Sequence, residues 1–328
     1  MPTNLPPEYY EAEERYRAAT TPVEKAERLE ELLSTIPKHK GTDHLRADLR
    51  RKLSRLKSEA QSKKGATRQV SPFHIDREGA GQVVVAGPPN TGKSALVNAL
   101  TNATPEVALH PYSTWTPTPG MMLVENVQIQ LIDTPPLSEE YVEPELLNLI
   151  RRADLLLLLI DIQAYPLQQL EDTVTFLEEQ RIVARQRREQ YPPDQPLITV
   201  PFLVVVNKCD DESWDEEFAI LCELLEDGWP MVPISAGEER NLEQLRRAIF
   251  EQLGIMRVYA RPPGKEADFS APFVLKKGST VQDFAGKVHK DFLENLKSAR
   301  VWGTGVYDGQ MVGRDHVLHE GDIVELRT

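Results

Sequence analysis

The chain has 328 residues, enough for two or three domains of roughly 100–200 residues each. Its net charge of −13 argues against indiscriminate coating of nucleic acid, although a local basic patch is compatible with it. The two cysteines have neither metal nor redox spacing, which predicts a reduced, cytoplasmic chain. The longest apolar run, residues 155–160, is too short to span a membrane, and the acidic N-terminus predicts that there is no signal peptide.

Residues 1–66 predict a helical region. The stretch "TPVEKAERLEELL" begins with a capping box, in which Thr21 is the cap, Pro22 takes the first helical position and Glu24 follows three residues after the cap. After "IPKHKGT", Thr42 can cap a second helix with one apolar seam. The pattern predicts a helical hairpin whose second helix presents Leu45, Leu49, Leu53 and Leu56.

Residues 38–68 differ in charge from the rest of the chain. They hold eleven Lys or Arg residues against three acidic ones. Two interpretations remain open: a solvated helix face, or a patch that contacts the phosphates of an RNA.

Residues 80–256 alternate strand and helix patterns, which predicts an α/β domain with a mostly parallel sheet and helices on both faces. "QVVVAG" is a strand, "KSALVNALTN" a helix, and "MMLVENVQIQLID" two strands about a turn at residues 125–126. The later expected elements are helix 143–152, strand 155–161, a helix over 167–182 or slightly longer, strand 200–206, helix 215–227, strand 231–235 and helix 241–253, with a surface loop at 187–196.

A linker at residues 260–268 precedes a last domain, 270–328. "PFVLKKG" predicts a strand and turn, and "STVQDFAGKVHKDFLENL" an amphipathic helix capped by Ser279 or Thr280. "SARVWG" and "DIVELRT" predict further strands. This order in about 60 residues suggests a β-grasp module.

The stretch "GPPNTGKS" matches G-x-x-x-x-G-K-S between a strand and a helix, the context that a phosphate loop requires. Lys93 would reach the β- and γ-oxygens of a nucleotide, and the Ser94 hydroxyl would ligate Mg²⁺. The predicted phosphate-site residues are Gly87, Pro88, Pro89, Asn90, Thr91, Gly92, Lys93, Ser94 and Ala95.

The stretch "NKCD" ends a strand and predicts the base site. Asp210 can accept hydrogen bonds from N1 and N2 of guanine, a pair of donors that adenine lacks. Asn207 and Lys208 would brace the phosphate loop and the base. "ISA" follows at the end of the next strand, where Ser235 and Ala236 would present backbone to guanine O6. The ordered set predicts GTP or GDP as the ligand.

The stretch "LIDTPPLSEE" raises a question about the third phosphate. Asp133 can hold Mg²⁺ through water. Pro136, however, stands where D-x-x-G proteins have a glycine whose N–H meets the γ-phosphate, and proline has none. Losing one hydrogen bond to a charged group costs about 1.5–3 kcal/mol, or roughly 10–100-fold in preference for GTP over GDP. The alternative is a displaced loop in which a neighbouring amide makes the contact.

These motifs resemble the Obg–HflX superfamily of GTPases, and most closely the developmentally regulated GTP-binding protein (DRG) family, over most of the chain. "IPKHKGTDHLRADLRRKLSRLKSE" resembles its helix-turn-helix region. "YSTWTPTPGMM" resembles its "FTTLTTVPG" switch segment and aligns Thr114 with the threonine that binds Mg²⁺. "TVQDFAGKVHKDF", "ARVWG" and "VGRDHVLHEGDIVEL" resemble its C-terminal TGS domain, a β-grasp fold linked to ribosome or RNA contact.

Three departures limit what the resemblance implies. Pro136 replaces the glycine, residues 161–207 are too few for the insertion that DRG proteins carry, and the basic tracts beside that insertion are missing. Leu137 stands where Ras-like enzymes place a glutamine that orients water.

The resemblance implies a GTP-binding protein with slow GTP hydrolysis that serves as a translation- or ribosome-associated switch, with Lys93, Thr114 and Asp133 in the catalytic centre. An alternative is a non-hydrolysing binding module whose switch Pro136 has locked. Asn90 matches an asparagine that coordinates K⁺ in some of these enzymes, or it merely satisfies loop amides. The expected partners are the guanine nucleotide and a ribosome or RNA bound through residues 38–68 and the TGS domain.

Overall fold

The computed structural model describes residues 73–101, 116–137, 142–225 and 228–328, together with six isolated positions near the N-terminus. The chain divides into two units, Met1–Val70 and Ser71–Thr328, and each is treated by itself. In the first unit the six described residues are all helical: Tyr16, Arg28, Leu29, Leu32, Thr35 and Leu49. The three leucines are buried, Leu49 of the predicted seam among them. The remaining seam leucines and the basic segment 38–68 lie outside the described residues.

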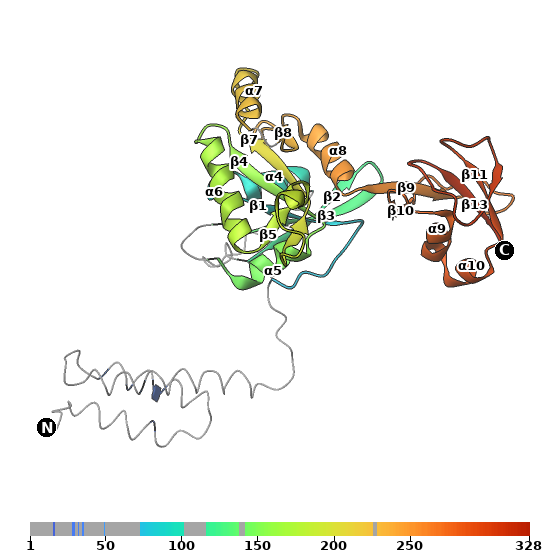
Figure 1. The fold of residues 1–328 in the computed structure, drawn as a ribbon, viewed down its shortest axis with the longest axis horizontal. Helices are drawn as coiled ribbons and strands as arrows, with labels where there is room; N and C mark the ends of the chain where they lie inside the picture. The colour runs from blue at the N-terminus through green and yellow to red at the C-terminus, as the bar shows by residue number, and fades with distance from the viewer. Residues whose placement is uncertain are drawn as a thin grey trace. The chain divides into compact units, whose positions relative to one another are not determined.

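The second unit begins with the predicted mostly parallel sheet (Figure 1). Its six strands run in the order β2-β3-β1-β4-β7-β8, and β2 alone is antiparallel to its neighbour. The predicted fold class is therefore confirmed. The bounds are β1 Gln82–Ala86, β2 Thr118–Val124, β3 Val127–Asp133, β4 Leu155–Asp161, β7 Phe202–Asn207 and β8 Met231–Pro233.

Helices cover both faces of this sheet, because its central strands are apolar on both sides. All seven residues of β4 are buried, which is typical of a parallel strand in the middle of a sheet. Alternate residues of β1 and β4 pack against α4 and α8 on one face and against α5, α6 and α7 on the other. The helices are α4 Lys93–Leu100, α5 Pro144–Arg152, α6 Pro166–Glu179, α7 Trp214–Leu224 and α8 Leu242–Gln252.

The segment between β4 and β7 is short and differs from the prediction. The expected helix 167–182 ends earlier, at Glu179, because Arg181 takes a left-handed conformation (φ 61°) and a strand follows. That strand, β5 Ile182–Ala184, pairs in parallel with β6 Ile198–Val200, and the predicted loop between them contains a 3₁₀ helix, η2 Arg185–Gln190. The segment between β4 and β7 thus consists of α6, the 3₁₀ helix η2 and this two-stranded sheet.

The C-terminal part is a five-stranded sheet in the order β10-β9-β13-β11-β12, with helices α9 and α10. Thr280, not Ser279, caps α9, and it forms a reciprocal capping box with Asp283. The single helix predicted here is wrong: His289, in extended backbone, separates α9 from α10. The bounds are β9 Ile255–Ala260, β10 Phe273–Lys276, α9 Val281–Val288, α10 Lys290–Asn295, β11 Ser298–Trp302, β12 Gln310–Val312 and β13 Ile323–Arg327.

Within the described part of the chain, no helix combines the length and apolar character needed to cross a bilayer.

Candidate nucleotide-binding site

The predicted phosphate loop connects the end of β1 to the start of α4, and its backbone requires glycine at two positions. Gly87 has φ 150° and Gly92 has φ 91°. A Cβ atom would lie 2.3 Å from the Leu159 carbonyl oxygen at the first position and 2.4 Å from Asn207 Nδ2 at the second. Neither neighbour can move without disturbing the sheet or the base loop. The loop therefore wraps tightly before α4, as a phosphate cradle must.

The Lys93 side chain lies across this loop. Its Nζ donates to the carbonyl oxygens of Gly87 (3.1 Å) and Pro88 (2.7 Å), and the residue is only 7% exposed. Burial lowers the pKa of Lys93 to about 8, although the nearby Asp133 carboxylate opposes the shift. The ammonium is thus held over the loop, ready to meet phosphate oxygens.

Ser94 and Asp133 form the candidate Mg²⁺ site. The Ser94 hydroxyl donates to Asp133 Oδ2 at 2.6 Å, while Asp133 Oδ1 is buried without a hydrogen-bond partner. Burial raises the pKa of Asp133, against the Ser94 hydrogen bond and the Lys93 charge. A buried oxygen with no partner beside a hydroxyl fits a hard cation with oxygen ligands. The third predicted ligand, Thr114, lies outside the described residues.

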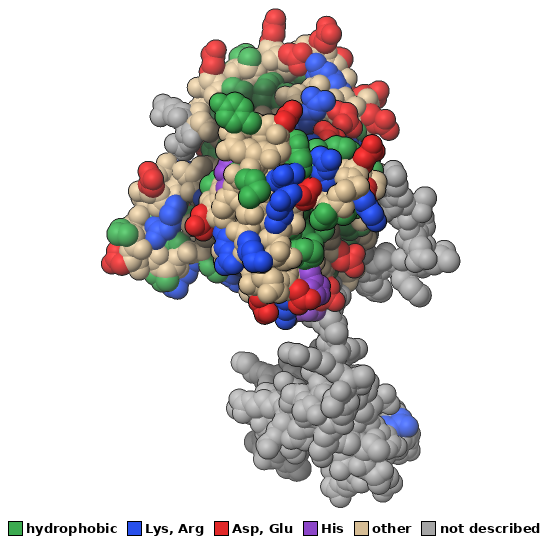
Figure 2. Space-filling model, turned by 90° about the vertical axis from the view of Figure 1, so that its right-hand side faces the viewer, with side chains coloured by type: hydrophobic (Ala, Val, Ile, Leu, Met, Phe, Trp, Pro, Cys, Tyr) green, Lys and Arg blue, Asp and Glu red, His purple; other side chains and the backbone are tan. Residues whose placement is uncertain are grey.

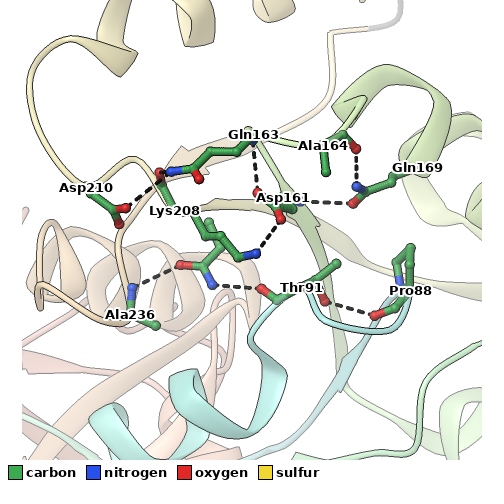
Figure 3. A network of polar contacts seen from close by, with 10 residues as sticks. Pro88, Thr91, Asp161, Gln163, Ala164, Gln169, Lys208, Asp210 and Ala236 are labelled. Atoms are coloured by element: carbon green, nitrogen blue, oxygen red, sulfur yellow. Dashed lines mark hydrogen bonds and ion pairs between the residues drawn. The ribbon is translucent and has the colours of Figure 1, made fainter.

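The base loop is joined to the phosphate loop by Asn207, the last residue of β7. Its Nδ2 donates to the Thr91 carbonyl oxygen at 2.8 Å, and its Oδ1 accepts from the Ala236 amide at 3.0 Å (Figure 3). These contacts place Asn207 between the phosphate loop and the base loop, and its part in bracing a bound base stays a prediction. One buried amide side chain therefore connects three of the predicted motifs.

The Asp210 carboxylate is exposed, and one of its oxygens contacts the next predicted motif. Its Oδ1 accepts from the buried hydroxyl of Ser235 at 2.6 Å. The Ser235 amide donates to the Arg240 carbonyl oxygen and the Ala236 amide to Asn207, so both amides have protein partners here. Their readout of guanine O6 stays a prediction.

The segment after β3 is attached to the phosphate loop. The Thr134 hydroxyl donates to the Val85 carbonyl oxygen at 2.8 Å, and Pro135 is buried. Because Pro136 has no N–H, the next amide is that of Leu137, and it donates to the Gly87 carbonyl oxygen at 3.1 Å. The Leu137 side chain is 6% exposed and belongs to the hydrophobic core that includes residues of α5 and α6.

Two residues beside the predicted base site, Asp161 and Gln163, belong to none of the sequence motifs. Lys208 Nζ pairs with the buried Asp161 carboxylate at the end of β4, and Gln163 lies next to it. The available signal was an aspartate at the end of an apolar strand, since parallel strands bring their carboxyl ends to one edge of the sheet.

Comparison with known proteins agrees with this geometry. Residues 82–208 match the family described as 50S ribosome-binding GTPase, and residues 256–328 match the TGS domain. An uncharacterized GTP-binding protein of Methanocaldococcus jannaschii is 31% identical, over 92% of both chains. Human developmentally-regulated GTP-binding protein 2 is 24% identical over 93% of this chain and 98% of its own length.

The chain belongs to the DRG family of GTPases. A further relative, ribosome-interacting GTPase 1 of Saccharomyces cerevisiae, is 26% identical over 94% of this chain and 99% of its own. Among solved structures, the Schizosaccharomyces pombe YchF GTPase shares the fold, with a TM-score of 0.54 and 13% identity over 77% of this chain and 99% of its own. As a DRG-family protein the chain binds GTP and GDP and is a GTPase in the broad sense.

The alignment of this DRG-family chain with its relative from M. jannaschii contains gaps in this chain. Their alignment extends over 368 positions, whereas the chain has 328 residues, so the relative carries residues that this chain lacks. The compact segment between β4 and β7 is consistent with the sequence prediction that an insertion is absent there.

The low pKa of Lys93 predicts a pH dependence of nucleotide binding. Below pH 8 the ammonium is charged before binding, and phosphates raise its pKa in the complex. Above pH 8 binding must therefore take up a proton, and the affinity for GDP is expected to fall by up to tenfold per pH unit. Calorimetry at pH 8.5 in two buffers of different ionisation enthalpy measures that proton uptake. An affinity that stays constant from pH 7 to 9 would contradict the assignment.

Proposed function

We propose that this chain is a slow GTP hydrolase of the cytoplasm whose nucleotide state controls its contact with the ribosome. The observation that supports slow GTP hydrolysis is the burial of the Leu137 side chain. A side chain held in the core cannot orient a water molecule, as the glutamine of Ras-like enzymes does from this position. Hydrolysis would rely on stabilisation of charge with little help in positioning the nucleophile.

The residues on the phosphate side support this chemistry. Lys93 would supply a positive charge at the β- and γ-oxygens, and the amides of the loop would surround the α- and β-phosphates. Ser94, Asp133 through water and Thr114 would hold Mg²⁺, which when bound neutralises charge on the β- and γ-oxygens. Single-turnover phosphate release measures the rate. We expect turnover far below that of an activated GTPase, and a fast intrinsic rate would refute the proposal.

A non-hydrolysing binding module is the second candidate, and one observation favours it. Thr134 and Leu137 both attach the segment after β3 to the strand and loop that hold the phosphates, and two successive prolines restrict its backbone. Such a segment resists the order–disorder change that many switches use. If no phosphate release were detected in any salt, the non-hydrolysing binding module would be favoured.

A monovalent cation is a candidate cofactor at Asn90. This residue has a left-handed backbone (φ 63°), is exposed, and within the described residues its side chain has no hydrogen-bond partner. The interpretation that it satisfies loop amides therefore gains no support. We expect single-turnover hydrolysis to be several-fold faster in KCl than in NaCl, and Asn90→Ala to remove the difference. Equal rates in the two salts would exclude K⁺.

Ribosome association is proposed from a relative's name, the TGS domain and the charge of residues 38–68. On the face that Figure 2 shows, basic and acidic side chains of the described residues are interspersed. The basic segment 38–68 is proposed as the phosphate-contacting part from its own charge.

Co-sedimentation with ribosomes, with GDP or a non-hydrolysable GTP analogue, tests the association. We expect the analogue to change the bound fraction, and the binding to weaken steeply with salt because phosphate contacts release counterions. A bound fraction that is the same with GDP and with the analogue would contradict control by the nucleotide state. A bound fraction that does not change with salt would indicate contacts with ribosomal protein.

A further inference from the structure

The loop that follows β4, residues 161–166, is organised by hydrogen bonds to its own side chains and to α6. The Asp161 amide donates to Gln169 Oε1 at 3.0 Å, and Gln169 Nε2 donates in turn to the Ala164 carbonyl oxygen. The Gln163 amide donates to Asp161 Oδ1 at 2.9 Å. These contacts fix the backbone at Gln163, and its side chain points toward the base loop (Figure 3).

Gln163 Nε2 makes two contacts with the base loop. It donates to the Lys208 carbonyl oxygen at 2.9 Å and to Asp210 Oδ2 at 3.2 Å. Lys208 has φ 67°, a left-handed backbone that a residue with a side chain adopts only with support from its surroundings. Gln163 therefore holds both the strained peptide and the carboxylate that follows it.

Each oxygen of the Asp210 carboxylate thus accepts one hydrogen bond from the protein. Ser235 Oγ donates to Oδ1, and Gln163 Nε2 donates to Oδ2. A carboxylate oxygen has two lone pairs, so one on each oxygen stays available. Two donors on the two oxygens restrict rotation of the carboxylate and set the plane in which it meets a ligand.

We propose that Gln163 is a positioning residue for base selection, which orients the Asp210 carboxylate so that both oxygens meet guanine. The inference rests on the binding of guanine by Asp210. Guanine donates from N1 and N2, so it requires both oxygens in one plane with the base. Hypoxanthine lacks the 2-amino group and donates from N1 alone, so it tolerates a rotated carboxylate. Gln163 accordingly contributes more to the binding of GDP than to that of inosine diphosphate.

The test compares the affinities for GDP and inosine diphosphate in the full-length protein and three variants. Gln163→Leu removes both donated hydrogen bonds, and Gln163→Glu places a like charge beside Asp210. Gln168→Leu is the matched control, because Gln168 is an exposed glutamine whose Nε2, among the described residues, donates to Asp172 on α6 and not to the base loop. Thermal unfolding without nucleotide checks that all variants are folded.

We expect Gln163→Leu to weaken GDP binding about three- to tenfold and inosine diphosphate binding less than twofold. Gln163→Glu should weaken GDP binding at least as much, and Gln168→Leu should change neither. If Gln163→Leu lost equal affinity for the two nucleotides, the loop would be loosened in general and the inference would be overturned. An unchanged affinity for both nucleotides would also overturn it. A wild-type protein that binds neither nucleotide would instead refute the proposed function itself.

Discussion

Replacing Pro136 with glycine is expected to raise the affinity for GTP relative to GDP by about 10–100-fold. Of the described residues at this position, Pro136 has no N–H, and the Leu137 N–H is already donated to the Gly87 carbonyl oxygen. A hydrogen bond to a charged phosphate contributes about 1.5–3 kcal/mol, and glycine would restore it. GDP has no γ-phosphate, so its affinity should stay the same.

Two variants separate the effect of the restored N–H donor from the effect of a more flexible backbone. Pro136→Ala restores the N–H with little added freedom, whereas Pro136→Gly restores the N–H and also relaxes the backbone. If the missing donor is the cause, both variants should gain GTP affinity in calorimetry with Mg²⁺. A gain with glycine alone would assign the effect to backbone strain. No gain with either would mean that Leu137 exchanges Gly87 for the γ-phosphate and already serves as the sensor.

Replacing Asp210 with alanine is expected to weaken GDP binding by about 10²–10⁴-fold. The carboxylate is exposed and oriented by Ser235 and Gln163, so it can accept from N1 and N2 of guanine together. Two hydrogen bonds to a charged group contribute about 3–6 kcal/mol in total. The preference for guanine over adenine should disappear with the side chain, because adenine never uses it.

The adjacent aspartate provides the control. Asp211 is exposed as well, but its carboxylate accepts from Ser213 at the start of α7 and has no part in the proposed base site. Asp211→Ala should therefore bind GDP like the wild type. If Asp210→Ala weakened GDP binding by less than about threefold, or if the variant still bound GDP in preference to ADP, Asp210 would not be the residue that selects the base.

The sequence predicted those elements whose signals are local. β4 is an unbroken apolar run between two aspartates, and α4 follows a glycine-rich loop, so both were recognisable from short windows. β9 was missed because its six residues follow directly on the end of α8 and precede a proline-rich linker. Its status as a strand depends on pairing with β10 and with the distant β13. The break at His289 was missed because the apolar spacing continues through it.

The same distinction applies to the site. The phosphate and base motifs were predictable because each is a short pattern with fixed spacing. Asp161 and Gln163 were not, since their roles arise only when β4 and β7 lie side by side and bring residues 45 or more positions apart into contact. The hydrogen bond from Leu137 to Gly87 likewise joins two loops from neighbouring strands, and no pattern within either loop encodes it.

The most direct test of the account is calorimetric titration of the full-length protein with GDP and with ADP, in the same buffer with Mg²⁺. A phosphate loop closed by Lys93 and a base loop ending in Asp210 predict binding of GDP, with ADP at least 100-fold weaker. Failure to bind GDP, or equal affinity for the two nucleotides, would contradict the central claim that this site selects guanine.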